Sequence, residues 1–575
     1  MVNEERELSL KDLFVPLTRT KAIVTIIVIG IFVYGNILLN GFVWDDLSFI
    51  INNPQVYQLN IPVLLGNNMF NNGPFYRPIP AVYFALLYSF FGQSAFFYHF
   101  LQLVLHISCT SLLFIFFQRF FGKKMSLFLS LIFLIHPINV ESVAYVGSTQ
   151  SELYFLPGIL ALLIISRTKL SAKQFILANG FLVLSIFTKE TGFIFLLVTV
   201  LYAYIFKSAN LKRFFFSGLA IGIVYALFRV LVGKVTYVMD QNIISIARLT
   251  LSQRIMNIPS VMLYYIKTFF YPSYLAIWQD WVIKIPNFAN FVIPLLICLL
   301  SFFIVVWTTI YLFKHNRKGF KAYIFFALWL IFGMGLLLHI VPLDMTVADR
   351  WFYFPMVGLL GVLGITLELF HFSRNRWFIG IAIIILVLLS YRTYVRSFDW
   401  RDELTLASRD NKQGTSVGLE NMLSADYFKE GDYARAKIHA QRSVSLNPLS
   451  VNYYNLGAAS YYLGDYRGTY DAFMNSTKHG NYYKTYESLA FLAINYGDPQ
   501  VNLVYMKKVS LKKFPNNPKI LYYLAALEYN FGNKELAKDY IGHAYRYDQG
   551  QEISAAYFAM MNNAPVRIGL TEKLK

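Results

Sequence analysis

The sequence predicts an all-α protein in two parts: a polytopic helical membrane domain and a solenoid of helical repeats. Three observations predict this fold class. The 575-residue chain is 56% hydrophobic and 18% aromatic, far outside the range of soluble globular proteins. Apolar runs of about 20 residues, long enough to cross a bilayer, recur through the first two thirds of the chain. After residue 417 the sequence becomes polar and tyrosine-rich, with a period of 33 to 35 residues that is typical of stacked helical hairpins.

Eleven segments are predicted to cross the bilayer, because each is apolar over most of its length. Two other apolar stretches are predicted to lie along the membrane surface: 73–92, and 255–271, whose internal lysine and proline disfavour a crossing. The predicted crossings are 21–40, 95–118, 124–138, 153–166, 174–188, 191–206, 213–233, 291–313, 322–341, 351–370 and 377–394.

The distribution of charge predicts the orientation, because Lys and Arg of short loops are retained on the cytoplasmic side. With the N-terminus inside, 19 Lys and Arg fall in inner segments and 8 in the outer segments before Arg350. The formal charge of +19 therefore indicates membrane topology and attraction to lipid headgroups, and no nucleic-acid partner is predicted. After the N-terminal tail one acid of the membrane domain, Glu368, falls inside, and nine fall outside: Asp45, Asp46, Glu141, Glu152, Glu190, Asp240, Asp280, Asp344 and Asp349.

The N-terminal tail contains four acids and no short apolar core followed by a small-residue cleavage site. The first apolar run is therefore predicted to remain as a helix, with the N-terminus in the cytoplasm and the repeats on the extracytoplasmic side. The compact loops favour the inner membrane of a bacterium. In a eukaryote the corresponding location is the endoplasmic reticulum membrane.

The predicted domains are a membrane domain at 1–395, a linker at 396–416 and about four tetratricopeptide-type repeats at 417–562. A single repeat cannot bury its apolar face, so stacked repeats form a solenoid with a concave face suited to a protein or peptide partner. A structural cap or a dimer surface is the alternative for this domain. The turns are marked by Gly-Asp or Gly-Asn pairs that begin at Gly431, Gly464, Gly497 and Gly532.

Asp45 and Asp46 directly follow the first predicted crossing, in GFVWDDLSFIINNP. Adjacent carboxylates repel each other, and in a partly dry setting the pKa of at least one is raised. A carboxylate with a raised pKa is suited to take a proton near neutral pH, as a general base does. Taken alone, the pair is more typical of helix caps or solvated loop acids than of a general base.

Further polar side chains are predicted at the outer ends of helices, where burying them costs free energy unless they are paired or used. Singly, they are typical of helix caps, snorkelling side chains or local ion pairs. Together they place cations and carboxylates on one membrane face, as binding of a lipid phosphate beside a base requires. These candidates are Arg77, His136, Glu141, Glu152, Lys189, Glu190, Arg229, Asp349 and Arg350.

No cofactor is predicted with certainty. Asp45, Asp46, His136 and Glu141 offer ligands suited to a divalent cation, although their spacing is not diagnostic of a metal site. The chain has two cysteines, both in apolar runs, so a disulfide framework is not predicted. It has no Gly-rich phosphate loop and no serine elbow, which disfavours ATP-driven transport and serine-type hydrolysis.

The ordered motifs resemble the membrane glycosyltransferases of the GT-C fold, and most of all the protein O-mannosyltransferase-like branch that carries C-terminal tetratricopeptide repeats. The resemblance covers nearly the whole chain. It rests on an acidic pair in the first outer loop, an interfacial helix, three later motifs in the same order, and the repeats. The motifs are FVWDD with INNP, YRP, HPINVES, TKETG and ADRWFYFP.

The resemblance implies that a sugar, mannose or another hexose, arrives on a polyprenyl or dolichyl phosphate and passes with inversion to a Ser or Thr hydroxyl of a protein. It implies that Asp45 acts as the base, assisted by Asp46. It also implies that Arg77, Lys189 and Arg350 hold the lipid phosphate. Motif positions without an individual role are His136, Glu141 and Glu190.

Two alternatives remain open. In the first, the same fold glycosylates a cell-envelope glycan or a lipid, and the repeats recruit partner proteins. In the second, the chain is a non-enzymatic membrane scaffold or transporter with a partner-binding domain. The gathering of polar groups at one membrane face, instead of near the middle of the membrane, disfavours a transporter.

Overall fold

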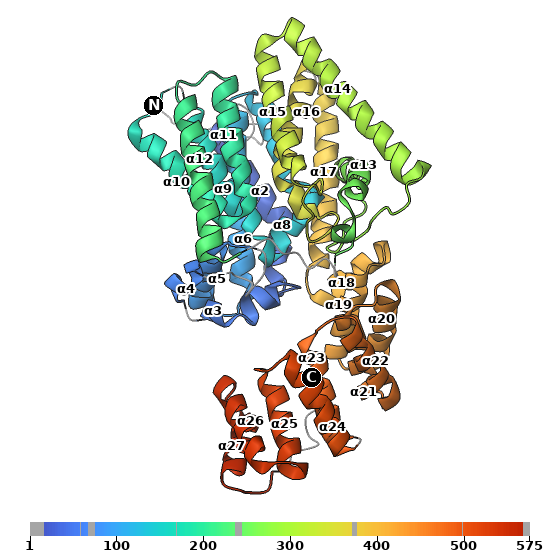
Figure 1. Cartoon of the computed structure of the whole chain (residues 1–575). Coiled ribbons are helices and arrows are strands. Elements are labelled where there is room, and N and C mark those ends of the chain that lie inside the picture. Colours follow the sequence, from blue (N-terminus) through green and yellow to red (C-terminus); the bar gives the residue numbers. More distant parts are fainter. Residues whose placement is uncertain are drawn as a thin grey trace, which may run out of the picture. The chain divides into compact units, whose positions relative to one another are not determined.

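The computed structural model of the chain describes two compact units, Met1–Gly414 and Thr415–Lys575 (Figure 1). Within the described residues all regular secondary structure is helical, and the predicted helical fold class is confirmed. The described residues are 17–57, 59–66, 75–167, 169–235, 244–370, 376–496 and 498–566.

Eight helices of the first unit, among the described residues, are long and apolar enough to cross a membrane. Each coincides with a predicted crossing. They are Arg19–Leu39 (α2 Arg19–Tyr34 with η1 Gly35–Leu39), Ala95–Phe117 (α6), Val146–Ile165 (η4 Val146–Ser148 with α9 Gln150–Ile165), Leu211–Val232 (α12 Leu211–Leu227 with η6 Phe228–Val232), Phe288–His315 (η8 Phe288–Val292 with α14 Ile293–His315), Arg317–Gly335 (α15), Asp349–Leu369 (η9 Asp349–Phe352 with α16 Tyr353–Leu369) and Trp377–Asp399 within α17 (Arg376–Asp399).

The other three predicted crossings are helical but differ in length or shape. Helix α7 (Lys123–Ile135) and the segment Pro137–Ala144, which comprises η3 (Pro137–Asn139) and α8 (Val140–Ala144), form one apolar pair bent by 49°. The bend falls at HPINVES, where Pro137 cannot continue the helix hydrogen bonds. The two shorter apolar helices are α10 (Ala172–Thr188) and Glu190–Ile205, which is η5 (Glu190–Gly192) followed by α11 (Phe193–Ile205).

Two helices correspond to the stretches predicted along the membrane surface. Helix α5 (Pro78–Phe91) is an apolar helix of 14 residues. Helix α13 (Leu251–Phe270) contains Pro259 and is too polar to count among the spans, yet it buries Tyr265 and Phe269 against the bundle. One face of α13 is therefore packed against the rest of the first unit.

The core of the first unit is dominated by aromatic side chains. Phe116, Phe326 and Trp329 are fully buried, and the Trp329 indole N–H donates to the Phe354 carbonyl at 3.0 Å. Between membrane-spanning helices, such side chains stabilise the bundle through close van der Waals packing, because lipid is as apolar as they are. This packing holds the outer helix ends, which carry the candidate residues, in fixed positions.

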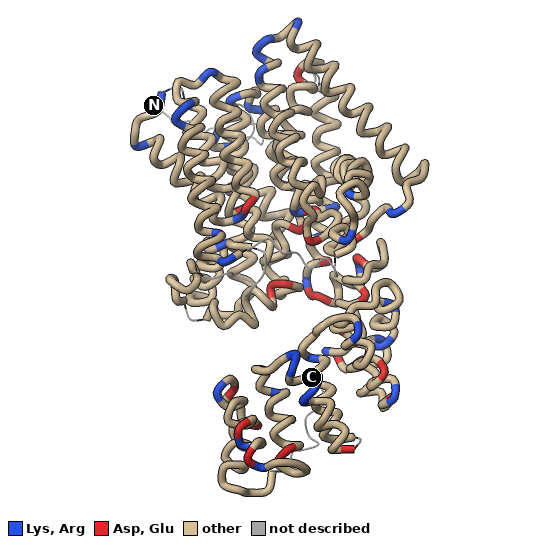
Figure 2. The backbone as a smooth tube through the Cα atoms, in the orientation of Figure 1, with Lys and Arg blue, Asp and Glu red and all other residues tan. Residues whose placement is uncertain are grey.

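Charged residues separate along the bundle of the first unit. Most Lys and Arg lie at the end near the N-terminus, and most Asp and Glu lie at the opposite end with a smaller number of Lys and Arg (Figure 2). This separation matches the partition on which the predicted orientation depends.

Most of the segment predicted as a linker, 396–416, is part of the first unit. Helix α17 continues to Asp399, and α18 (Glu403–Gln413) follows it. Arg396 and Asp410 are both buried, and the guanidinium donates twice to the carboxylate, at 2.5 and 3.1 Å. Charged residues of the predicted linker therefore pair with one another inside the first unit.

The second unit consists of four helical hairpins and a final helix. The hairpins coincide with the predicted repeats. They are α19 (Val417–Lys429) with α20 (Tyr433–Leu446), α21 (Ser450–Tyr462) with α22 (Tyr466–Lys478), α23 (Tyr483–Asn495) with α24 (Pro499–Tyr505) and η11 (Met506–Leu511), and α25 (Pro518–Phe531) with α26 (Lys534–Tyr547), followed by α27 (Gln551–Met561).

The turn pairs explain how each hairpin reverses direction. Gly431 and Gly464 have φ of +81° and +75°, a left-handed conformation that glycine adopts without strain. The next residue caps the following helix: Asp432 and Asp465 each accept a backbone N–H from the first turn. Gly532 differs, with φ of −138°, while Asn533 still caps its helix. Gly497 lies outside the described residues.

Candidate active site

The loop after α2 is held in shape by Asp46. Its buried carboxylate accepts the backbone N–H of Val43 at 3.0 Å and that of Gly147 at 2.6 Å. The second bond fastens the loop to the start of the span that contains α9. Asp46 is therefore placed to hold its neighbour, Asp45, and not to reach a substrate itself.

Asp45 is half-buried beside a group of aromatic rings. Its carboxylate accepts the Tyr145 hydroxyl at 3.1 Å. The preceding residue, Trp44, has φ of +54°, a strained value for a non-glycine residue, and its ring stacks on Tyr145 with centroids 5.4 Å apart. Such strain costs about 1 to 3 kcal/mol and persists only where the surroundings enforce it. The contacts of Asp45 and Trp44 with Tyr145 therefore hold this part of the loop.

The two acids differ in pKa. Burial raises the pKa of Asp45 to about 6, opposed by the nearby Arg350 cation and the Tyr145 hydrogen bond. Burial raises the pKa of Asp46 to about 8, even though two backbone N–H groups stabilise its carboxylate. At neutral pH Asp45 is thus the acid of the pair that is ionised and able to accept a proton.

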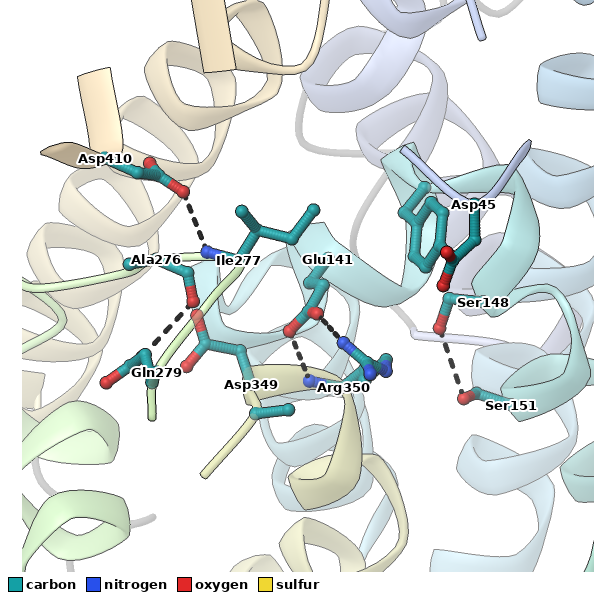
Figure 3. Close-up of polar contacts among 12 residues, drawn as sticks. Asp45, Glu141, Ser148, Ser151, Ala276, Ile277, Gln279, Asp349, Arg350 and Asp410 are labelled. Carbon is teal, nitrogen blue, oxygen red and sulfur yellow. Dashed lines mark hydrogen bonds and ion pairs between the residues drawn. The ribbon is translucent and has the colours of Figure 1, made fainter. Parts of the chain in front are cut away.

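Arg350 pairs with Glu141. The guanidinium contacts one carboxylate oxygen of Glu141, and the Arg350 backbone N–H donates to the other oxygen at 3.0 Å. Both side chains are largely buried, and the guanidinium carbon lies 5.5 Å from the Trp44 ring centroid. In the view of Figure 3 the pair lies between Asp45 and Asp349. HPINVES and ADRWFYFP thus meet through one buried ion pair.

Asp349 makes contacts of a different kind from its neighbour Arg350. Its carboxylate accepts the Tyr264 hydroxyl at 2.5 Å, and that hydroxyl accepts the Gln279 amide at 2.6 Å. Asp349 is buried and is bound by α13, not turned toward the cations of the other motifs. Tyr264 and Gln279 were not among the predicted site residues, because neutral side chains within apolar runs carry little signal.

Arg77, Glu190 and Arg229 form a second cluster. The Glu190 carboxylate receives Arg77 at 2.8 Å and Arg229 at 3.2 Å, and all three side chains are partly exposed. Arg77 also donates to the Gln150 amide oxygen at 2.6 Å. The start of α5, the turn before α11 and the end of α12 therefore converge on one carboxylate.

Lys189 lies between the two clusters. Its ammonium donates to the Ser151 hydroxyl at 3.4 Å, and Ser151 lies 3.4 Å from Ser148, which stands beside Asp45 in Figure 3. Among the described residues no carboxylate lies within 4.0 Å of this ammonium. Burial, with the positive charges of Arg77 and Arg350, lowers the pKa of Lys189 to about 7. Lys189 is thus an ammonium without a carboxylate at ion-pair distance among the described residues, and its protonation changes near neutral pH.

Glu152 lies fully buried one residue after Ser151. Neither of its carboxyl oxygens has a hydrogen-bond partner among the residues that the structure describes. It was predicted as a substrate-binding residue. The structure instead encloses it within the protein, in the span that contains α9.

His136 has a structural place at the bend after α7. One ring nitrogen accepts the Ile138 backbone N–H at 3.2 Å, the other is 2.9 Å from the Phe269 carbonyl, and the ring stacks on Phe269. Both nitrogens are therefore engaged, which leaves none for the predicted substrate contact. Within the described part of the chain, no group of three or more His, Cys, Asp and Glu side chains is placed to hold a metal ion.

An apolar groove of about 940 Å³ runs along α11 and α12. Its lining includes Leu197, Phe215, Leu219 and Ile223, with Lys212 at one end. At the other end α11 begins directly after Glu190, and α12 continues into the turn that carries Arg229. The groove therefore leads from the basic end of the bundle toward the cluster of Arg77, Glu190 and Arg229.

No protein-family model matches the chain. The chain is similar to the human "Protein O-mannosyl-transferase TMTC3", with 30% identity over 139 residues, which cover 22% of this chain and 15% of that protein. It is similar to the human "Protein O-mannosyl-transferase TMTC1", with 29% identity over 147 residues, 24% of this chain and 17% of that protein. The Xenopus laevis "Protein O-mannosyl-transferase tmtc2" matches with 28% identity over 225 residues, 33% of this chain and 26% of that protein.

The matched stretches span between 15% and 26% of the length of these relatives. The same name recurs in all three, and it agrees with the resemblance expected from the motifs. That resemblance is therefore confirmed: over these stretches the chain is similar in sequence to proteins named protein O-mannosyl-transferase.

Proposed function

We propose that the chain is a membrane glycosyltransferase of GT-C type that transfers a hexose from a polyprenyl or dolichyl phosphate to a Ser or Thr hydroxyl of a protein. The observation that carries this proposal is the geometry of one site. Asp45 is ionised near neutral pH and feels the charge of Arg350, which also acts on Lys189, and Lys189 has no carboxylate within 4.0 Å among the described residues. A base next to a vacant cation suits a reaction between a hydroxyl and a phosphate ester.

The proposed reaction is a single displacement with inversion. Asp45 takes the proton of the acceptor hydroxyl while its oxygen forms a bond to the anomeric carbon of the sugar. The bond between that carbon and the phosphate oxygen breaks, and the electron pair leaves with the lipid phosphate. Lys189, with Arg77 and Arg350 nearby, stabilises the negative charge that develops on the phosphate.

The groove along α11 and α12 supports a lipid-linked donor. Its lining is nearly all apolar, and several of its side chains face outward from the bundle, among them Phe215 and Ile223. One end reaches the elements that carry Glu190 and Arg229. An isoprenoid chain in this groove would place its phosphate beside the cations. The relatives named as protein O-mannosyl-transferases support mannose as the sugar and a protein as the acceptor.

The proposed location follows from the charge separation. With the basic end of the bundle in the cytoplasm, the site opens on the extracytoplasmic face, and the repeats bind the acceptor or a partner protein there. The same arrangement fits a bacterial inner membrane or the endoplasmic reticulum.

The test is transfer from labelled lipid-linked hexoses to a panel of Ser- and Thr-containing peptides by the purified protein. Asp45→Asn is expected to lower the rate by about 10² to 10⁴, the usual contribution of a general base. Asp46→Asn is the matched control, because its side chain holds the loop. It should cost about 1 to 3 kcal/mol of stability through the lost backbone hydrogen bonds and retain turnover in the folded fraction. Full turnover by Asp45→Asn would remove the base assignment.

A further inference from the structure

Helix α18 is fastened to the bundle by a buried charge pair. Asp410 receives two hydrogen bonds from Arg396, and its Oδ2 also accepts the backbone N–H of Ile277 at 2.7 Å. One helical turn later, Gln413 accepts the backbone N–H of Leu275 at 3.0 Å. One face of α18 therefore holds the backbone of the segment 275–281.

The same segment is joined to the residues that precede Arg350. The Gln279 carbonyl accepts the Thr346 backbone N–H at 3.0 Å, and the Thr346 hydroxyl donates to the Trp281 carbonyl at 2.5 Å. The Gln279 side chain gives a second connection, because its amide donates to the Tyr264 hydroxyl, which donates to Asp349. Figure 3 shows the hydrogen bond between Asp410 and Ile277, with Gln279, Asp349 and Arg350 in the same view.

The position of Arg350 affects the electrostatic surroundings of both Asp45 and Lys189. Its guanidinium pairs with Glu141 and lies over Trp44, the residue before Asp45. Its charge acts on Asp45 and on Lys189. A shift of the backbone at 346–350 would move this charge relative to both residues.

We propose that Asp410 and Gln279 are positioning residues for Arg350: α18 holds the segment 275–281, and this segment holds the backbone and the Asp349 carboxylate that orient the guanidinium. The catalytic consequence rests on the proposed function, whereas the structural connection does not. Helix α18 is also the last helix before the repeats, since three residues separate it from α19. The helix that precedes the repeats would thus help to set the position of the Arg350 guanidinium.

The buried pair makes this connection sensitive to a single change. Removing the Asp410 carboxylate leaves Arg396 buried with one ion-pair partner among the described residues, Asp399, at 3.1 Å. A buried charge that loses its partner destabilises its surroundings strongly, so α18 and 275–281 should separate. Gln279→Leu is a milder second variant, because it retains the backbone pairing of 279 with 346 and removes the amide bond to Tyr264.

The experiment is hydrogen exchange of the full-length protein in detergent, read by mass spectrometry for peptides covering 346–353. The Arg350 N–H is protected by Glu141 in the intact site. Asp410→Ala and Gln279→Leu should each increase deuterium uptake in these peptides. Asp280→Asn is the matched control: it lies in the same segment, but its carboxylate accepts from Ser245 at 2.8 Å and does not lead to Arg350. Unchanged uptake in both test variants would overturn the proposal.

Transfer assays of the same variants test the consequence for catalysis. Asp410→Ala and Gln279→Leu should lower kcat/KM about tenfold or more, because a displacement of about 1 Å at a catalytic group can cost 10²-fold. Asp280→Asn should retain the wild-type value. If Asp410→Ala and Gln279→Leu lowered kcat/KM no more than Asp280→Asn, the positioning role would be overturned. The proposed transferase function would not be affected by that result. A wild-type protein without any transfer would instead count against the proposed function, and hydrogen exchange would still decide the connection.

The pH profile separates positioning from general destabilisation. The charged and titratable groups that act on Asp45 are Arg350, Tyr145, Asp46, Asp344 and, from α18, Glu403. Arg350 lowers the pKa of Asp45. A displaced guanidinium should therefore move the acid limb of kcat/KM to higher pH in the two test variants and not in the control. An unmoved acid limb in both would contradict the role assigned to Asp410 and Gln279.

Discussion

Asp45 and Lys189 are two groups of the candidate site whose ionisation falls close to neutral pH. Asp45 must be deprotonated to act as a base, and Lys189 must be protonated to hold a phosphate. The pKa of Asp45 is raised to about 6, and that of Lys189 is lowered to about 7. The active form of the free enzyme is therefore confined to a narrow pH range.

This difference predicts a bell-shaped dependence of kcat/KM on pH. The rate should rise as the pH increases through about 6, where Asp45 loses its proton, and fall through about 7, where Lys189 loses its proton. The measurement is initial transfer rates between about pH 5 and pH 9. Bound phosphate favours the charged ammonium, so the alkaline limb of kcat should lie at higher pH than that of kcat/KM.

Lys189→Arg provides the control for this assignment, because a guanidinium stays protonated throughout this range. It should remove the alkaline limb and leave the acid limb in place. An alkaline limb that persists in Lys189→Arg would assign that limb to another group.

At the scale of residues, the sequence could identify which side chains belong to the outer helix ends but not which of them meet. Glu141 and Arg350 are 209 positions apart, and Arg77 and Glu190 are 113 apart. Such pairs depend on how distant helices pack, which no local pattern encodes. His136 is a similar case. It was predicted to bind substrate, because the sequence does not reveal that its two ring nitrogens contact the Phe269 carbonyl and the Ile138 backbone N–H.

At the scale of elements, the groove along α11 and α12 gives a test of the lipid-linked donor. A side chain at Gly218 would enter the groove, since a Cβ there would have its nearest neighbour at 3.9 Å. Gly218→Leu should raise KM about tenfold for a donor with a long isoprenoid chain, because the loss of several buried CH₂ groups costs about 0.8 kcal/mol each. A donor with a short chain should bind as before. The measurement is KM for donors of graded length.

Gly180→Leu is the matched control for the groove. Gly180 lies exposed on α10 with open space around it, and it is not part of the groove lining. This variant should leave KM unchanged at every chain length. Equal effects of the two substitutions would show that the groove does not hold the donor chain.

The repeat turns give a second test at this scale. Gly464 has φ of +75°, so Gly464→Ala should destabilise its hairpin by about 1 to 2 kcal/mol. Gly542, within α26, has its nearest neighbour to a Cβ at 3.9 Å, and Gly542→Ala should stabilise by about 0.5 to 1 kcal/mol. Hydrogen exchange of the repeat unit in the full-length protein measures both changes. Changes of the same sign would contradict the turn geometry.

The elements were the most predictable part of the molecule. A helix occurs at each apolar run that was predicted to cross the bilayer. The Gly-Asp pairs located hairpin turns, because each pair combines a left-handed residue with a helix cap. The segment 396–416 was less predictable. It was predicted as a linker, and only the packed structure shows that Arg396 and Asp410 pair inside the first unit.

At the scale of the whole molecule, the separation of charges along the first unit predicts its orientation in the membrane. The basic end should face the cytoplasm, and the end with Asp45 should face the opposite compartment. In a background without native cysteines, Ser273→Cys and Ser445→Cys should react with an impermeant thiol reagent in intact cells or sealed vesicles of native orientation. His315→Cys should react only after permeabilisation. Labelling of positions 273 and 315 from the same side would contradict the predicted crossings.

Glu190 has a consequence for how the molecule would complete a cycle. In the proposed reaction, the released lipid carrier keeps its phosphate, and this phosphate would occupy the cations that bound the donor. Because Glu190 is bound to both Arg77 and Arg229, any visiting anion must compete with an internal one. This competition would lower the affinity of these cations both for the released lipid phosphate and for the next donor. Glu190, which has no assigned role in the reaction itself, would thereby reduce product inhibition by the released lipid phosphate.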